Sequence, residues 1–386
     1  MKVKSLLSLS HQRPHVSAVV TLALRLFSGW VIALLALHLV PRGNWYHNQQ
    51  SPLLAPFLRW DSGWYLAISQ FGYTTLISHA FFPLYPLLIR VISPIFGFGG
   101  GALIVSWASA YFALWGVIDV AEHYVTRQSS LYAAALLAWS PLSVFLIAGY
   151  PEGLLVATMI WSLRFCIERR WLLASVLAGI ASAVMPEGIL SGLVVVVAIV
   201  VTQLDRLELW RVTLYAIISE IGVTCYAIFN WAITGSLLIN FRAEEQGWGT
   251  HLTYPLRVIY DTWQHLIMTG QSPSVVVVLV VNFVGAFVGL LVTIFALVIR
   301  RDVKHSWPVV LLLVLGVILA LSTTSPSVES TGRFVFFLAP LYVVGAFIIE
   351  RLPTTVKLKV VRSVLITSII LAVGFSILFN NGWWLT

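Results

Sequence analysis

The residues best suited to chemistry stand together in a short aromatic stretch near residue 60. In the run RWDSGWY, residues 59–65, the carboxylate of Asp61 lies among three aromatic side chains and stands two residues after an arginine. A carboxylate held within hydrogen-bond reach of a hydroxyl can accept its proton during group transfer. The alternative is an interfacial belt of Trp and Tyr that contains an exposed aspartate, and composition alone favours that alternative.

Three further charged residues stand at the ends of apolar stretches. Glu152 follows a Gly-Tyr-Pro turn and opens a helix, where a carboxylate often only matches the helix dipole. Glu187 follows Pro186 between two short apolar runs, and a carboxylate at that depth is costly unless it faces a cavity or a partner. Arg333 starts a predicted helix, whose N-terminus favours an anion, although an arginine there can also snorkel to the interface.

The elements that position these residues follow from an extreme composition. Of the 386 residues, 59% are hydrophobic and 10% are charged, and the mean hydropathy is +0.92. Soluble domains are roughly 45–50% apolar and 25% charged, so the chain is an integral membrane protein. Its net charge of +8 comes from short basic clusters between apolar segments. This pattern is typical of membrane orientation signals, and no nucleic-acid partner is expected.

About eleven apolar stretches are long enough to be transmembrane helices. They are predicted at residues 17–40, 101–121, 129–148, 152–168, 171–186, 188–204, 211–233, 274–300, 307–323, 334–350 and 361–380. Residues 171–204 would be either two short spans or one bent helix. The first stretch follows Lys2 and Lys4 but lacks a cleavage site, so it is expected to be a retained anchor. The predicted fold is an all-α bundle, a single polytopic domain over residues 1–386.

The distribution of basic residues predicts the orientation of the bundle. With a cytoplasmic N-terminus, 16 of the 23 Lys and Arg residues fall inside, 6 fall outside and one lies within the first helix, as the positive-inside rule requires. Residues 81–98 contain three prolines and Arg90, so they are predicted to be an amphipathic segment on the outer surface. The large outer loops are then residues 41–100 and 234–273, and chemistry is expected on the outer face.

The second outer loop contributes two more candidate residues. Trp248 could stack on a sugar face and Arg242 could contact a phosphate, although the stretch also fits an ordinary amphipathic surface helix. Cys166 and Cys225 lie inside apolar helical stretches and indicate neither a disulfide nor a metal site. The sequence contains no metal-ligand spacing, P-loop or dinucleotide fingerprint. No metal or cofactor is therefore expected.

The order of residues in the first outer loop resembles that of a known family. The run WDSGWYLAISQFGY, followed by AFFPLYPLL, is similar to the first luminal loop of the PIG-V family, the GPI mannosyltransferase 2 proteins and their prokaryotic relatives. These are polytopic glycosyltransferases of the GT-C class. Weaker similarities follow in the family's order between residues 140 and 340, and dense matching covers residues 59–88. Glu187 departs from the family, which usually carries R-S-N-G at that point.

The resemblance implies a GT-C-like bundle with juxtamembrane helices in the first outer loop. It also implies an inverting mannosyltransferase that takes its sugar from a polyprenyl-phosphate donor and gives it to a hydroxyl of a lipid, glycan or protein. Asp61 would be the catalytic base and Arg333 would bind the lipid phosphate. Glu152 would be a second acid that positions the acceptor or transfers a proton. The remaining predicted substrate contacts are Trp60, Tyr85, Glu187, Arg242 and Trp248.

Two other functional classes stay open. A transporter or flippase would use intramembrane acids such as Asp119 and Glu220, but the chain shows no internal repeat. A non-catalytic subunit with a GT-C-like fold is the other alternative. Convergence of the candidate residues on one outward-facing cavity would favour a transferase. The absence of an N-glycosylation sequon favours a prokaryotic plasma membrane over the endoplasmic reticulum.

Overall fold

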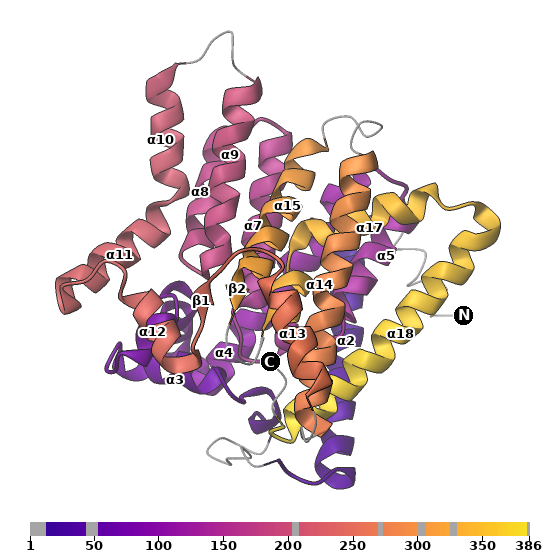
Figure 1. Ribbon diagram of the computed structural model, residues 1–386, viewed down its shortest axis with the longest axis horizontal. Coiled ribbons are helices and arrows are strands. Elements are labelled where there is room, and N and C mark those ends of the chain that lie inside the picture. Colours follow the sequence, from indigo (N-terminus) through magenta and orange to yellow (C-terminus); the bar gives the residue numbers. More distant parts are fainter. Residues whose placement is uncertain are drawn as a thin grey trace.

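The computed structural model of the chain is a bundle of helices (Figure 1). It describes residues 13–43, 53–202, 208–268, 273–299, 306–324 and 330–383, so Lys2 and Lys4 lie outside the described residues. The α-helices are α2 (Pro14–Leu39), α3 (Ser62–Phe71), α4 (Leu84–Glu122), α5 (Arg127–Ala138), α6 (Val144–Ile147), α7 (Glu152–Ile167), α8 (Trp171–Ser182), α9 (Ile189–Thr202), α10 (Leu209–Ser219), α11 (Ile221–Thr234), α12 (Ile239–Trp248), α13 (Arg257–Ile267), α14 (Pro273–Ile299), α15 (Trp307–Ser322), α16 (Thr331–Phe336), α17 (Ala339–Arg351) and α18 (Thr354–Asn380). Short 3-10 turns occur at Ala55–Phe57, Ile77–Ala80 and Pro186–Gly188. Two-residue strands β1 (His251–Leu252) and β2 (Thr323–Thr324) form an antiparallel pair, and the predicted all-α class is otherwise confirmed.

Four of the described helices, α2, α4, α14 and α18, are long and apolar enough to cross a membrane. Helices α10 and α11 qualify together as a fifth span that is bent by 61°. The chain is therefore a multi-pass membrane protein, but the predicted number of about eleven spans is not confirmed. One cause is visible at the predicted helix 129–148. Helix α5 ends at Ala138 and α6 begins only at Val144, because Pro141 between them cannot continue the helical hydrogen-bond ladder.

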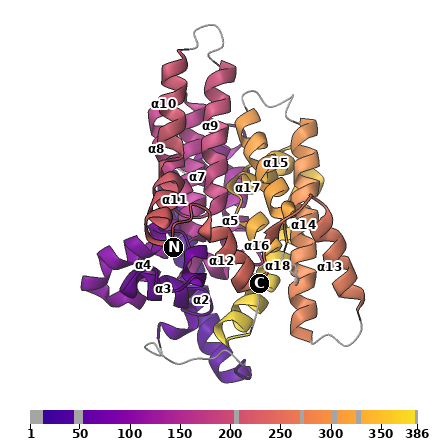
Figure 2. The ribbon, with the colours of Figure 1, turned by 60° about the vertical axis from the view of Figure 1, so that its left-hand side comes forward.

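Helix α4 changes direction at Gly97. This glycine has φ 69° and ψ 167°, a left-handed conformation that interrupts a helix and that other residues rarely adopt. Figure 2 shows the first part of α4 projecting sideways from the bundle beside α3. In that part Val91 and Ile95 are 75% and 79% exposed, which suits contact with lipid. The break agrees with the predicted separation of an outer surface segment from a span that begins near residue 101.

Residues 171–204 contain two helices rather than one. Helices α8 and α9 lie side by side (Figure 1) and are joined through the 3-10 turn Pro186–Gly188. The turn is tight, since a Cβ on Gly188 would lie 1.9 Å from the carbonyl oxygen of Ala181. Glu187 is thereby held in a rigid connection at one end of the helix pair.

The segment that carries α12 and β1 is fastened to the rest of the bundle by the strand pair. His251 is paired with Thr324 and Leu252 with Thr323, and the backbone N–H of Thr253 donates a hydrogen bond of 2.6 Å to the carbonyl of Ser322. These bonds connect the chain after α12 to the end of α15. Helix α12 is thereby kept close to the end of α15.

Candidate active site

Asp61 is placed by a tightly braced loop. The preceding residue, Trp60, has φ 55°, a left-handed conformation that is uncommon for a residue with a side chain. The Tyr150 hydroxyl accepts a hydrogen bond of 3.1 Å from the backbone N–H of Asp61 and donates one of 3.1 Å to the carbonyl of Arg59. The backbone N–H of Gly149 also donates to the carbonyl of Phe57 at 2.9 Å. The loop that carries Asp61 is therefore held against the turn before α7.

This contact between loop and turn depends on the absence of a side chain at Gly149. A Cβ there would lie 2.6 Å from Cδ2 of Leu58 and 3.4 Å from Oγ of Ser62. We expect Gly149→Ala to destabilise the protein by about 1–3 kcal/mol through overpacking and to lower its activity. The measurement is thermal unfolding in detergent. Gly345→Ala in α17 is the matched control, since its Cβ would meet no atom within 4 Å, and a Tm drop as large as that of Gly149→Ala would contradict this account.

Arg333 is the centre of the site. Its Nη1 lies 3.0 Å from Oδ2 of Asp61, and its Nε lies 3.4 Å from Oε1 of Glu152. All three side chains are largely buried, with exposed fractions of 13%, 19% and 2% respectively. The predicted helix start at Arg333 belongs to α16, which has only six residues. Any attraction for an anion is therefore assigned to the guanidinium and not to a helix dipole.

A cavity of about 100 Å³ lies in front of Arg333. Asp61 and Arg333 line it, together with Glu187, Trp248 and Glu244. Glu152 lies behind Arg333 and is fully buried. Four candidate residues from distant parts of the chain, Asp61, Glu152, Glu187 and Arg333, are thus brought together as the sequence predicted.

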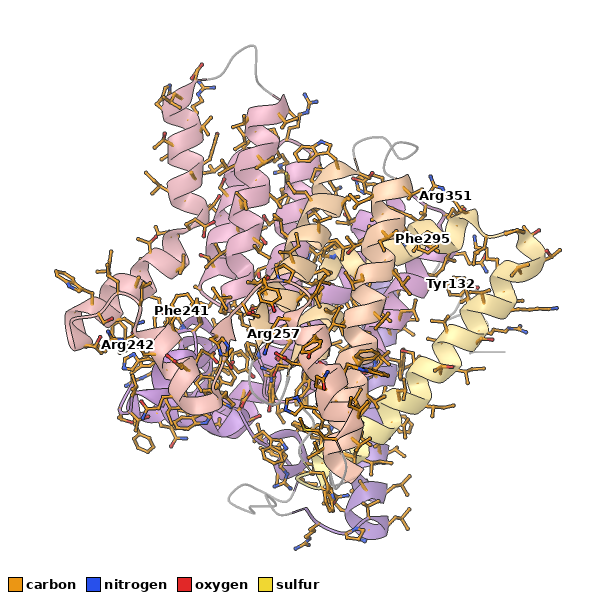
Figure 3. The ribbon with its side chains drawn as sticks, in the orientation of Figure 1. Tyr132, Phe241, Arg242, Arg257, Phe295 and Arg351 are labelled. Atoms are coloured by element: carbon orange, nitrogen blue, oxygen red, sulfur yellow. The ribbon has the colours of Figure 1, made fainter. Side chains whose placement is uncertain are left out.

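Three of the predicted substrate contacts lie elsewhere. Tyr85 is fully buried, and its hydroxyl donates to the carbonyl of Ala102 at 3.0 Å and lies 2.8 Å from Oγ of Ser106. Trp60 is partly buried in the hydrophobic core and does not line the cavity. Arg242 is exposed on α12, on the side of the molecule near α11 (Figure 3). Tyr85 therefore supports the wall of the site through the ring of Tyr65, whereas Trp60 and Arg242 do not line the cavity.

Glu244 is a cavity residue that the sequence interpretation missed. It stands four residues before Trp248 on α12 and therefore shares a helix face with it. The ring of Trp248 packs edge-on against Phe81 at 5.6 Å, which directs this face toward the cavity. Burial, and then the nearby Asp61 carboxylate, raises the pKa of Glu244 from 4.5 to about 7. The i, i+4 spacing to a candidate sugar-binding Trp was the signal that could have identified it.

The raised pKa of Glu244 predicts a pH effect on stability. The folded protein holds a proton between pH 4.5 and 7 that the unfolded chain releases, so the free energy of unfolding decreases as the pH rises through this window. We expect Glu244 to contribute a loss of ~1–3 kcal/mol, so that Glu244→Gln loses less stability than the wild type over this range. Thermal unfolding at pH 5 and pH 8 measures it. The exposed neighbour Glu245 is the control. Between pH 5 and pH 8, Glu245→Gln should lose as much stability as the wild type does.

A second, apolar cavity of about 330 Å³ adjoins the first. The two share lining residues, among them Glu187, Glu244 and Phe334. Leu190, Ala227 and Leu238 form part of the apolar wall. A polar chamber that continues into an apolar one suits an amphiphilic ligand with a polar head and a hydrocarbon tail. Within the part of the chain that the structure describes, no three His, Cys, Asp or Glu side chains gather as a metal site.

Comparison with known proteins points to one family. The family model described as "Mannosyltransferase (PIG-V)" matches residues 42–230, the region that contains Asp61, Glu152 and Glu187. Human GPI alpha-1,6-mannosyltransferase 2 is 34% identical over 152 residues, and the Cricetulus griseus protein of the same name is 32% identical over 152 residues. Each match covers 36% of this chain and 31% of the relative. The match thus spans less than a third of these curated relatives.

The overall fold has solved counterparts. The structure of ArnT from Cupriavidus metallidurans bound to undecaprenyl phosphate is similar with a TM-score of 0.56 and 13% sequence identity. This similarity covers 93% of this chain and 76% of ArnT. The apo state of the same protein gives a TM-score of 0.55. At this level of identity the comparison concerns the fold, which is that of a GT-C membrane protein.

Proposed function

Because the chain belongs to the PIG-V mannosyltransferase family, we propose that it transfers a mannosyl residue from a polyprenyl-phosphate-linked donor to an acceptor hydroxyl. The observation that carries the proposal is the buried Asp61–Arg333 pair, which lines the polar cavity described above. A carboxylate beside a cation is the minimum needed for this reaction. The carboxylate accepts the proton of the attacking hydroxyl, and the cation stabilises charge that develops on the leaving phosphate.

The geometry suggests how Arg333 and Asp61 change partners when the donor binds. In the structure the guanidinium contacts the carboxylates of Asp61 and Glu152. A phosphate that binds Nη1 would compete with Asp61 for it, and Glu152 would continue to hold the Nε side. Asp61 would then face the acceptor hydroxyl without a salt bridge and would be the stronger base. The hydroxyl oxygen bonds to the anomeric carbon as the carbon–phosphate oxygen bond breaks, and the proton passes to Asp61.

The apolar cavity fits the hydrocarbon tail of such a donor. Ala227 lines this cavity, and Ala227→Phe would fill part of it with a larger side chain. We therefore expect this substitution to raise KM for a long polyprenyl-phosphate donor by roughly tenfold. A short donor with one or two isoprene units should be affected little. The neighbouring residue Ile228 is 54% exposed, so Ile228→Phe is the matched control. Equal effects of the two substitutions, or equal effects on long and short donors, would contradict a tail in this cavity.

We also propose the place and direction of the reaction. The orientation inferred from basic residues puts Asp61, Glu187 and Arg333 on the outer face of the membrane, with the N-terminus in the cytoplasm. A prokaryotic plasma membrane fits better than the endoplasmic reticulum. The acceptor hydroxyl would belong to a lipid, a glycan or a protein.

The intramembrane acids that a transporter would use, Asp119 and Glu220, do not line a common translocation path. Asp119 is ion-paired with Arg164, which also contacts Glu168 at 2.6 Å. Glu220 lies at the bend between α10 and α11. Neither residue lines the cavity in front of Arg333. This separation favours a transferase over a transporter or flippase.

The experiment that tests the proposal is sugar transfer in purified membranes. Radiolabelled polyprenyl-phosphate mannose is supplied, and label is measured in lipid, glycan and protein fractions. Transfer above the level of membranes that lack the protein is the expected result. If no fraction gains label from this donor or from other lipid-linked sugars, the chain is a non-catalytic relative of the family.

A further inference from the structure

The charges around the cavity do not balance. Among the described residues that line it or lie directly behind it, the four carboxylates of Asp61, Glu152, Glu187 and Glu244 face a single guanidinium, that of Arg333. Arg333 contacts two of the four. With all groups ionised, the net charge is −3. A donor phosphate would add a further negative charge to this site, and juxtaposed like charges oppose binding.

Glu187 is the carboxylate least compensated by the protein. The residue is 6% exposed, and its Oε2 is buried without a hydrogen-bond partner. A buried polar atom in this state is rare and calls for a ligand or another specific explanation. The connection through Pro186 and Gly188 fixes the backbone, so Glu187 has little freedom to move to a partner elsewhere.

Glu187 and Glu244 lie at the junction of the two cavities. Both line the polar chamber and the apolar one, whereas Asp61 and Arg333 line only the polar chamber. The other ionisable residues that line the apolar chamber are Tyr226 and His251, and Nδ1 of His251 lies 3.0 Å from the carbonyl of Gly249. The two carboxylates therefore flank the position where a donor's phosphate would meet its tail, and both lack a cationic partner among the described ion pairs.

We propose that the acceptor carries a primary ammonium group, which binds between the carboxylates of Glu187 and Glu244. An ammonium has three N–H donors and can reach both carboxylates through charge-assisted hydrogen bonds. It also offsets the charge that the donor phosphate brings. The inference rests on the proposed function, because it concerns the acceptor in that reaction.

Direct binding tests the inference without any need for transfer. The probes are 2-aminoethyl α-mannoside and 2-hydroxyethyl α-mannoside, which differ only in an ammonium and a hydroxyl, titrated calorimetrically into the full chain in detergent at pH 7. We expect the ammonium compound to bind the wild type about tenfold more tightly. Glu187→Gln and Glu244→Gln should each remove most of this preference. Glu245→Gln, an exposed position on the same helix, should retain it.

Other outcomes separate this inference from the proposed function. Equal binding of the two probes by the wild type, or no binding of either, overturns the inference. The inference is also overturned if mannose transfer requires Mg²⁺ and the preference for the ammonium compound vanishes when Mg²⁺ is present. In that case the cation bound at the site is a metal ion. Mannose transfer without any preference for ammonium leaves the proposed function intact. A preference for ammonium in a protein that transfers no sugar overturns the proposed function and, with it, the acceptor role of the bound ammonium compound.

Discussion

Asp61→Asn is expected to lower kcat for mannose transfer by roughly 10²–10⁴-fold, the usual contribution of a positioned general base. The amide retains the shape of the side chain but cannot accept the proton of the attacking hydroxyl. Radiolabelled transfer in purified membranes, at matched expression, measures the effect. The fold should persist, because the backbone bond from Asp61 to the Tyr150 hydroxyl at 3.1 Å does not use the carboxylate.

The matched control is Asp261→Asn on α13. Asp261 is ion-paired with Arg257 at 2.9 Å, but it does not line the cavity in front of Arg333, and an exposed pair of this kind contributes little to stability. Activity close to that of the wild type is expected. Wild-type transfer by Asp61→Asn would reject Asp61 as the base and would direct attention to Glu152.

The convergence of distant residues on one site could be predicted from the sequence. Apolar stretches and the basic residues between them assign each chain segment to one side of the membrane. Asp61, Glu152 and Arg333 each stand just before or at the start of a helix on the predicted outer side, so a common site was expected. The partners within that site could not be predicted, because they depend on packing such as that of Gly149 against Leu58.

The errors in the predicted site have a common cause. A sequence motif contains residues that build the wall of a site as well as residues that face its cavity. Tyr85 builds the wall, because its hydroxyl is bonded within the protein core. The direction of α12 decides that Glu244 faces inward and Arg242 outward. That direction is held by the pairing of β1 with β2, a contact between residues about 70 positions apart that no local pattern indicates.

The course of each predicted span could not be read from the sequence for a similar reason. Apolar composition identifies membrane segments, but it does not show where a segment breaks. The stretch at residues 211–233 reads as one helix, although the chain bends by 61° at Glu220. Such breaks are tolerated where the freed backbone groups are satisfied within the protein.

The second large effect is expected at Arg333. Removal of the guanidinium should weaken binding of the proposed polyprenyl-phosphate ligand by roughly 10–150-fold, the range for charge-assisted hydrogen bonds. Arg333→Lys retains a charge but cannot reach Asp61 and Glu152 with a planar fork, so an intermediate loss is expected. Binding to the purified protein, rather than activity, is the measurement, because it reports the phosphate contact alone.

Arg333→Ala by itself is a poor test of phosphate binding. It would leave Glu152, 1% exposed, as a buried charge without a cation, which costs about 3–5 kcal/mol. The double substitution Arg333→Ala with Glu152→Gln removes that charge, and we expect it to restore the Tm toward that of the wild type. Its affinity for a polyprenyl phosphate should stay as low as that of the single variant. If the double variant binds the lipid phosphate as the wild type does, Arg333 is a structural partner of Glu152, and the phosphate site lies elsewhere in the cavity.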